Sequence, residues 1–233
     1  MRAIVEGDRA ALVAATADRL AALLAECIAA QGRATIALTG GSVGIELLAS
    51  LVDRDIDWER VVVTWSDERF VPADSPDRNA RQAREALFDR VPIPADNVRE
   101  LPASDGRSLD DAAERATAML AALGGIDLTL LGMGPDAHVA SLFPGLPGVG
   151  EVGTRVIAVR DSPKPPPERL SFTLDAINGS ERVWLIVAGA DKAEAVALAH
   201  SGAGAVEAPA GAVEGRLETL MLLDDAAAGR LAD

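Results

Sequence analysis

The alternation of short apolar runs with helical patterns constrains the fold of this chain more than any other feature of its sequence. Runs with the length and apolar character of buried strands lie at 35–38, 61–65, 128–131, 156–159, 183–187 and 219–223. Helical patterns lie at 8–30, 44–52, 78–90, 108–123 and 191–199. Strands that alternate with helices are joined by right-handed crossovers and form a mainly parallel sheet. The sequence therefore predicts one α/β domain over residues 1–233.

Charge and composition exclude several classes of partner. The net charge is −14 and no run of Lys or Arg occurs, so we expect no nucleic-acid partner. No apolar stretch is long enough to span a bilayer, and the first residues lack the apolar core of a signal peptide. Cys27 is the single cysteine and falls on the apolar face of the first predicted helix, which indicates a buried thiol. We therefore expect a cytoplasmic protein with no membrane partner and no bound metal.

The segment 127–145, DLTLLGMGPDAHVASLFPG, brings one of the two histidines to the end of a predicted strand. Ligands of open α/β sheets bind at the carboxyl ends of the strands, and histidine changes its charge near neutral pH. His138 is therefore a candidate general base. Pro135 suits the first position of a helix, which would place His138 in a first turn whose dipole disfavours imidazolium. Asp136 is a candidate to orient the ring, provided that the loop brings the two side chains together.

Two further loops follow predicted strands. Gly40, Gly41 and Ser42 lie between a strand and a helix, where glycines let a backbone approach an anion and helix N–H groups can bind it. Arg69 ends the cluster Ser66-Asp67-Glu68-Arg69, which follows the strand 61–65. Its guanidinium suits an oxyanion or a phosphate. Because all three loops end parallel strands, we expect them to converge on one site.

Positive charge from a proline-rich loop is a further candidate for this site. Lys164 stands among prolines in the segment 163–167, and the chain has only one other lysine, Lys192. Arg169 follows shortly after it. Proline fixes the backbone, so the loop can hold Lys164 in place. We interpret Lys164 and Arg169 as contacts for an anionic substrate, with an ordinary residue at the start of a helix as the equal alternative for Arg169. The Gly- and Ala-rich segment 201–215 is interpreted as a mobile loop.

A serine esterase is a rival interpretation. The sequence 40–44 matches G-x-S-x-G, and Ser42, Asp136 and His138 occur in the order Ser, Asp, His. Only one predicted strand precedes Ser42, however, and no HGGG-type oxyanion loop lies upstream. An Asp and a His two residues apart also suit a triad poorly, since triad members usually come from different loops.

These segments together resemble the 6-phosphogluconolactonase family. The matching stretches are LTGGS (38–42), SDERFVP (66–72), RN (78–79), the whole of 127–145, and DSPKPPPERLSFTL (161–174). The resemblance covers nearly the whole chain. It implies a Rossmann-like sheet with helices on both faces, as in sugar-phosphate isomerases. It also implies hydrolysis of a small-molecule sugar-phosphate lactone, 6-phospho-D-glucono-1,5-lactone, in the oxidative pentose phosphate pathway, without metal or cofactor.

The resemblance also assigns roles to individual residues. The base of the family falls on His138, its aspartate partner on Asp136 and its active-site arginine on Arg69. The substrate and phosphate contacts of the family fall on these residues: Gly40, Gly41, Ser42, Lys164 and Arg169.

Some positions depart from the family pattern, and some alternatives stay open. Ala137 replaces the usual glycine, which costs about 1 kcal/mol if the position needs a positive φ. A glucosamine-6-phosphate deaminase shares the fold, but it tends to have DEY and FNEP where this chain has residues 67–69 and 142–145. A non-catalytic sugar-phosphate sensor would be expected to carry a helix-turn-helix, which is not evident. The sequence leaves a monomer and a homodimer equally open.

Overall fold

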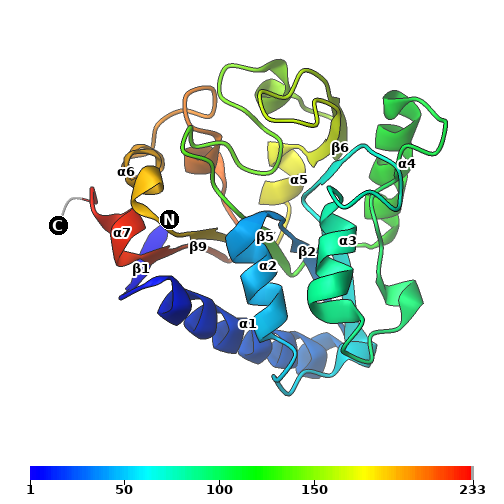
Figure 1. The fold of residues 1–233 in the computed structure, drawn as a ribbon, viewed down its shortest axis with the longest axis horizontal. Helices are drawn as coiled ribbons and strands as arrows, with labels where there is room; N and C mark the ends of the chain where they lie inside the picture. Colours follow the sequence, from blue (N-terminus) through cyan, green and yellow to red (C-terminus); the bar gives the residue numbers. More distant parts are fainter. Residues whose placement is uncertain (232–233) are drawn as a thin grey trace.

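The computed structural model describes residues 1–231 and contains a six-stranded sheet whose strand pairs are all parallel (Figure 1). The strand order is β1-β9-β8-β5-β2-β3. The strands are β1 (Arg2–Glu6), β2 (Ala34–Leu38), β3 (Val61–Trp65), β5 (Leu128–Leu131), β8 (Arg182–Val187) and β9 (Glu218–Asp224). The predicted mainly parallel α/β fold is confirmed. β1 was not predicted, because its partly exposed residues do not form a continuous apolar run.

A second, three-stranded sheet is antiparallel and has the order β4-β7-β6. Its strands are β4 (Asp67–Arg69), β6 (Val156–Val159) and β7 (Arg169–Phe172). The strand at 156–159 was predicted, whereas the short strands β4 and β7 were not. Ser66 joins the two sheets, because its N–H donates to the Leu38 carbonyl (2.9 Å) and its carbonyl accepts from Phe172 N–H (2.8 Å). We call this junction the Ser66 seam.

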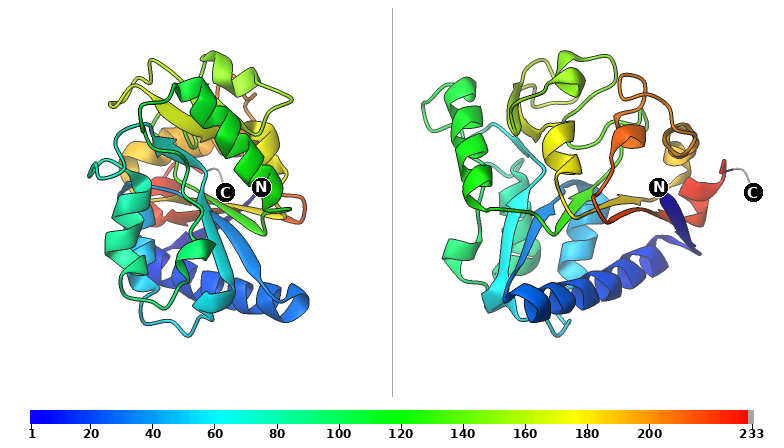
Figure 2. Two further views of the ribbon diagram at one scale, coloured as in Figure 1. Left: turned by 90° about the vertical axis from the view of Figure 1, so that its right-hand side faces the viewer. Right: turned by 180° about the vertical axis from the view of Figure 1, so that it is seen from behind.

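Helices cover both faces of the main sheet, as expected. The helices are α1 (Arg9–Gln31), α2 (Gly41–Ser50), α3 (Asn79–Ala83), α4 (Leu109–Ala122), α5 (Leu174–Asn178), α6 (Ala193–His200) and α7 (Asp225–Ala228). α1 lies along one side of the sheet and contacts α2, whereas α5 and α6 lie on the other side with the small sheet (Figures 1 and 2). Asp8 caps the start of α1 by accepting from Ala11 N–H (2.8 Å). No described helix is long and apolar enough to cross a bilayer.

Three local predictions need correction. α2 begins at Gly41 rather than at residue 44, so the glycine pair lies at the helix start itself. The pattern at 78–90 is α3 followed by a π-helical turn (Arg84–Phe88). The segment 201–215 contains a 3₁₀ turn (Pro209–Ala212) whose first two residues are buried, so part of it packs against the core.

The strand order positions the site. The chain passes from β2 to β3 on one side and then crosses to β5 on the other side of β2. Ligands of open α/β sheets bind outside the carboxyl ends of the strands at such a reversal. The loops after β2, β3 and β5, which carry the candidate residues, therefore begin at neighbouring points of one sheet edge.

Candidate active site

A cavity of about 280 Å³ lies at this edge, and we call it the carboxyl-end cavity. The loops after β2, β5 and β8, strand β4, helix α3 and the β6–β7 connection all contribute to its walls. Its lining includes these residues: Thr39, Gly40, Gly41, Asp67, Arg69, Asn79, Gly134, His138, Lys164, Pro165, Arg169 and Lys192. The predicted convergence of the three loops is thus observed. Residues 1–231 contain no group of three His, Cys, Asp or Glu side chains placed to hold a metal ion.

His138 and Asp136 form a close pair in the loop after β5. Nδ1 of His138 lies 2.5 Å from Oδ1 of Asp136, and the ring packs on Phe143 with centroids 4.6 Å apart. An ionised carboxylate only accepts hydrogen bonds, so Nδ1 carries the proton and Nε2 keeps its lone pair. The expected helix at Pro135 is wrong, because residues 135–136 form a turn. The turn brings together two side chains that a helix would point to different faces.

Backbone geometry specific to this loop makes the pair possible. Ala137 has a φ of 62°, so the position does require the left-handed conformation that favours glycine. The loop closes on itself through hydrogen bonds from Gly134 N–H to the His138 carbonyl and from Ala137 N–H to the Gly134 carbonyl, both 3.0 Å. A side chain at Gly134 would overlap the His138 ring and the Asp136 carboxylate. Gly134 is therefore needed for the pair to form.

Burial decides the charge of the His138 ring. It lowers the pKa of His138, and the hydrogen bond that the ring donates to Asp136 opposes this without reversing it. Burial would raise the pKa of Asp136, but contact with His138 outweighs this and lowers it. At neutral pH the ring is therefore neutral and the carboxylate is charged. The sequence argument predicted a neutral ring from a helix dipole, whereas its cause here is desolvation.

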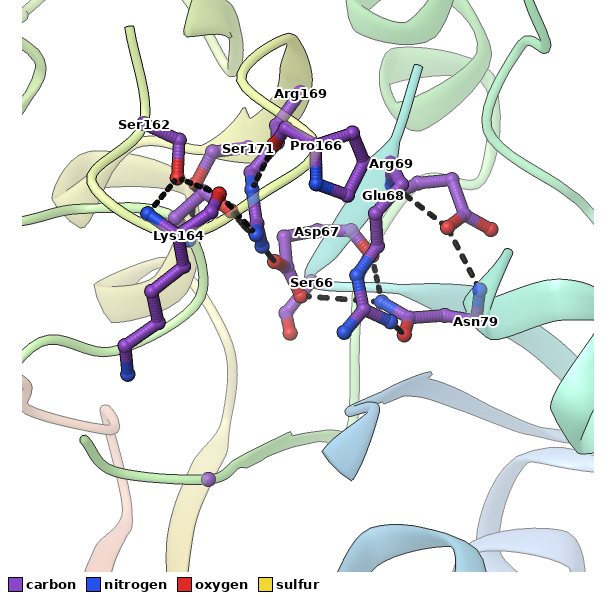
Figure 3. Close-up of polar contacts among 12 residues, drawn as sticks. Ser66, Asp67, Glu68, Arg69, Asn79, Ser162, Lys164, Pro166, Arg169 and Ser171 are labelled. Atoms are coloured by element: carbon purple, nitrogen blue, oxygen red, sulfur yellow. Dashed lines mark hydrogen bonds and ion pairs between the residues drawn. The ribbon is translucent and has the colours of Figure 1, made fainter. Parts of the chain in front are cut away.

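Arg69 reaches the cavity from β4 and is held by Asn79 at the start of α3 (Figure 3). Its Nη1 donates to Oδ1 of Asn79, whose Nδ2 donates to the Asp67 carbonyl (2.9 Å). The carboxylate of Glu68 ties the two elements together, since it accepts from the N–H groups of Arg69 (2.7 Å), Asn79 (2.8 Å) and Ala80 (2.9 Å). Arg69 therefore keeps a fixed guanidinium at the cavity wall.

Both lysines of the chain line the same cavity. Lys164 comes from the β6–β7 connection, and Lys192 comes from the turn that follows β8. Partial burial lowers the pKa of Lys164; Asp136 opposes this, and the charges of Lys192 and Arg169 add to it. The two amines thus lie close enough to influence each other, and they bring concentrated positive charge to a strongly acidic protein.

Arg169 is buried and uses its donors on the protein (Figure 3). Nη2 donates to the carbonyls of Lys164 (2.9 Å) and Pro165 (3.3 Å), and Nε donates to that of Pro166 (3.2 Å). Nη1 lies 4.0 Å from Oδ2 of Asp67. Its predicted contact with substrate stays a prediction, while the observed contacts fix the loop that carries Lys164.

The glycine loop after β2 approaches the cavity through its backbone. Gly40 and Gly41 line it, and a side chain at Gly40 would overlap the amide of Asn79. Oγ1 of Thr39 accepts from Gly132 N–H (3.0 Å), which ties this loop to the one that carries His138. Ser42 is exposed and is not among the lining residues, so its predicted role also stays a prediction.

Sequence reasoning missed Lys192, Asn79 and Thr39 as cavity residues. Lys192 was seen only as the second of two lysines. The rule that found His138 also applies to it, because Lys192 follows the carboxyl end of a predicted strand. Asn79 was noted only as part of the matching stretch RN (78–79), since its role comes from contact with Arg69, ten positions away.

A sequence profile described as glucosamine-6-phosphate isomerases/6-phosphogluconolactonase matches residues 7–222. The chain belongs to this family. It is 48% identical to a 6-phosphogluconolactonase of Streptomyces coelicolor, with 98% of this chain and 94% of the relative covered. It is also 48% identical to a 6-phosphogluconolactonase of Mycobacterium tuberculosis, with 96% of each covered. The family resemblance found from the motifs is thereby confirmed.

Solved structures agree with this assignment. The 6-phosphogluconolactonase of Thermotoga maritima superposes with a TM-score of 0.87 at 25% identity over 96% of this chain and 99% of that one. That of Trypanosoma brucei gives 0.85 at 27% identity over 99% and 98%. A monomeric glucosamine-6-phosphate deaminase gives 0.85 at 20% identity over 99% and 100%. That last likeness shows the shared fold alone.

Proposed function

We propose that this protein hydrolyses 6-phospho-D-glucono-1,5-lactone to 6-phosphogluconate with a water molecule activated by His138. The observation that carries the proposal is the 2.5 Å contact between Nδ1 of His138 and Oδ1 of Asp136 in a cavity lined by four basic side chains. It leaves a neutral ring with an unprotonated Nε2 beside positions suited to an anion. The lactonase names of relatives that match nearly the full chain support the choice of substrate.

The chemistry follows from the proton on the ring. Nε2 removes a proton from water while the water oxygen attacks the lactone carbonyl. Asp136 stabilises the imidazolium that forms, because its carboxylate stays charged. The oxyanion of the tetrahedral intermediate is stabilised by Arg69 or by N–H groups of the glycine loop. The imidazolium then returns the proton to the ring oxygen as the C–O bond breaks, so His138 ends neutral.

The phosphate anchors the substrate away from the reacting carbon. We assign Lys164 and Lys192 to this anion, with backbone N–H groups at Gly40 and Gly41 as further donors. Binding energy from a remote group helps to orient the lactone for attack. The positive charge also attracts an anionic substrate to a protein whose net charge is −14.

The test is lactone hydrolysis with substrate generated in place and compared with the spontaneous rate. Wild type should turn over fast, and His138→Ala should lose about 10²- to 10⁴-fold in kcat, the usual worth of a general base. Ser42→Ala should keep kcat. Loss of turnover in Ser42→Ala with an acyl group trapped on Ser42 would replace the proposal by the serine esterase. A wild type that is inactive on the lactone but converts glucosamine 6-phosphate would replace it by the deaminase, and binding of 6-phosphogluconate without turnover would replace it by the sensor.

A further inference from the structure

Three buried side chains meet at the wall of the carboxyl-end cavity, and two of them, Asp67 and Arg169, line it. Oγ of Ser141 donates to Oδ2 of Asp67 (2.7 Å) and accepts from Nη1 of Arg169 (3.5 Å). All three residues are buried, at 6%, 2% and 6% exposure for Asp67, Ser141 and Arg169. We call this group the Arg169 hub.

Each member of the hub belongs to a different wall of the cavity. Asp67 lies two residues before Arg69 on β4, and its carbonyl holds Asn79. Ser141 ends the loop that carries His138, and its N–H donates to Oγ of Ser171 (3.1 Å). Arg169 begins β7 and reaches back to the Lys164 loop. The hub therefore connects the proposed oxyanion, base and phosphate positions.

The N–H groups of the Arg169 guanidinium are used in contacts within the protein. Four hydrogen bonds go to three loop carbonyls and to Ser141, and the guanidinium has five N–H groups. Its charge is balanced by Asp67 at 4.0 Å. A planar guanidinium can donate to several carbonyls at fixed angles, whereas the ammonium of a lysine cannot reproduce that pattern. The contacts thus fit a residue that holds backbone better than one that binds a ligand.

We infer that Arg169 is a positioning residue that acts through Lys164, and that Asp67 and Ser141 join it to the loop of His138. The inference rests on the proposed function for the reaction it serves, but it concerns the route by which Arg169 affects the site. If Arg169 bound the substrate directly, KM would depend mainly on its positive charge and less on the planar shape of the guanidinium. If Arg169 positions Lys164, KM depends on the shape of the guanidinium, and substitution of Arg169 no longer changes KM when Lys164 is absent.

A double-mutant cycle on Arg169 and Lys164 separates these routes. Arg169→Lys keeps the positive charge but loses the planar guanidinium. We expect it to raise KM about tenfold, close to the rise in Arg169→Met. In the Lys164→Ala background, Arg169→Lys should change KM by less than about twofold. A wild-type KM for Arg169→Lys beside a raised KM for Arg169→Met, or additive effects in the cycle, would overturn the inference.

Ser141→Ala is the milder hub variant and should raise KM and lower kcat together, whereas a purely structural hub would lower Tm with both constants unchanged.

A second readout does not depend on turnover. Because the chain has only two lysines, NMR of ¹³C-labelled lysine side chains gives one ε-carbon signal for Lys164 and one for Lys192, assigned with Lys192→Arg. Arg169→Lys adds a third signal, which Arg169→Met avoids. In Arg169→Met the Lys164 signal should move and titrate at higher pH, while the Lys192 signal keeps its position. An unmoved Lys164 signal would overturn the inference even in a protein without lactonase activity, and a wild type without lactonase activity beside a moved signal would count against the proposed function alone.

Discussion

Two hollows lie at opposite ends of the main sheet, and the larger one is not the candidate site. The amino-end cleft has a volume of about 770 Å³, against about 280 Å³ for the carboxyl-end cavity. Its lining carries three basic and three acidic side chains: Arg33, Arg155, Arg216, Asp127, Asp175 and Glu181. The carboxyl-end cavity carries four basic side chains and one acidic one, beside a half-buried histidine.

The two hollows differ in charge balance as well as in volume, and the excess of positive charge lies in the smaller one. In the amino-end cleft, Arg216 lies 3.5 Å from Glu181, and Arg33 donates to the Leu123 carbonyl (3.1 Å). In the carboxyl-end cavity, Lys164 has no carboxylate within ion-pair distance among residues 1–231. Lys192 lies 3.1 Å from Asp191 and Arg169 lies 4.0 Å from Asp67, so Lys164 and Arg69 are the cations of this cavity that no carboxylate of residues 1–231 pairs with. The following substitutions test this contrast.

Gly134→Ala should have the largest effect. Its Cβ would overlap both His138 and Asp136, so the pair cannot keep its geometry. Loss of a positioned base costs about 10³-fold in kcat, measured by lactone hydrolysis. Gly132→Ala is the matched control, because its Cβ would lie 3.6 Å from Oγ1 of Thr39, an ordinary contact. Equal activity of the two variants would contradict the role given to Gly134.

Asp136→Asn should lower kcat by about 10²-fold, because the amide can donate to Nδ1 and so favour the tautomer that protonates Nε2. Asp136 raises the pKa of His138, so its loss lowers that pKa further. His138 acts as a base above its pKa, which already lies below the ordinary value. The acid limb of the pH–rate profile should therefore lie below about pH 6.5 in wild type and move to lower pH in the variant. A shift to higher pH would contradict the assignment.

Lys164→Ala and Lys192→Ala should each raise KM by about 10- to 100-fold, since a charge-assisted hydrogen bond is worth about 1.5–3 kcal/mol. The dependence of KM on salt should also weaken. Arg155→Ala removes an exposed charge from the amino-end cleft and is the control. If Arg155→Ala raised KM as much as the lysine variants, the contrast between the two hollows would not hold.

Ala137→Gly should have the smallest effect. Relief of the strain at φ 62° is worth about 1 kcal/mol, and it is offset by the greater freedom of glycine in the unfolded chain, about 0.4–1 kcal/mol. The free energy of unfolding in urea should change by less than about 1 kcal/mol, with kcat unchanged. A large gain in kcat would mean that Ala137 holds the His138 loop away from its working geometry.

Several parts of the fold and site were predictable from local patterns. Runs such as Val61–Trp65 and Leu128–Leu131 are apolar and bounded by turn residues, so their strands and the loops at their ends were found. β4 was not, because Asp67, Glu68 and Arg69 disfavour a strand locally and pair only through contact with β7.

The side-chain contacts of the site were harder to predict. The pairing of Asp136 with His138 depends on one positive φ, which residue types do not reveal. Arg169 was predicted to contact substrate because the sequence shows a cation near Lys164, whereas its direction is set by three carbonyls of its own loop. Every residue type supplies a backbone carbonyl, so the sequence does not show that these carbonyls bind Arg169.

The Ser66 seam divides the support of the cavity between two sheets. The loops of His138, Gly40 and Lys192 stand on the main sheet, whereas Arg69 and the Lys164 loop stand on the small one. Substitutions in the β6–β7 connection can therefore move Lys164 while the histidine loop and its six-stranded support keep their sequence. One wall of the cavity can in this way change without a change in the wall that faces it.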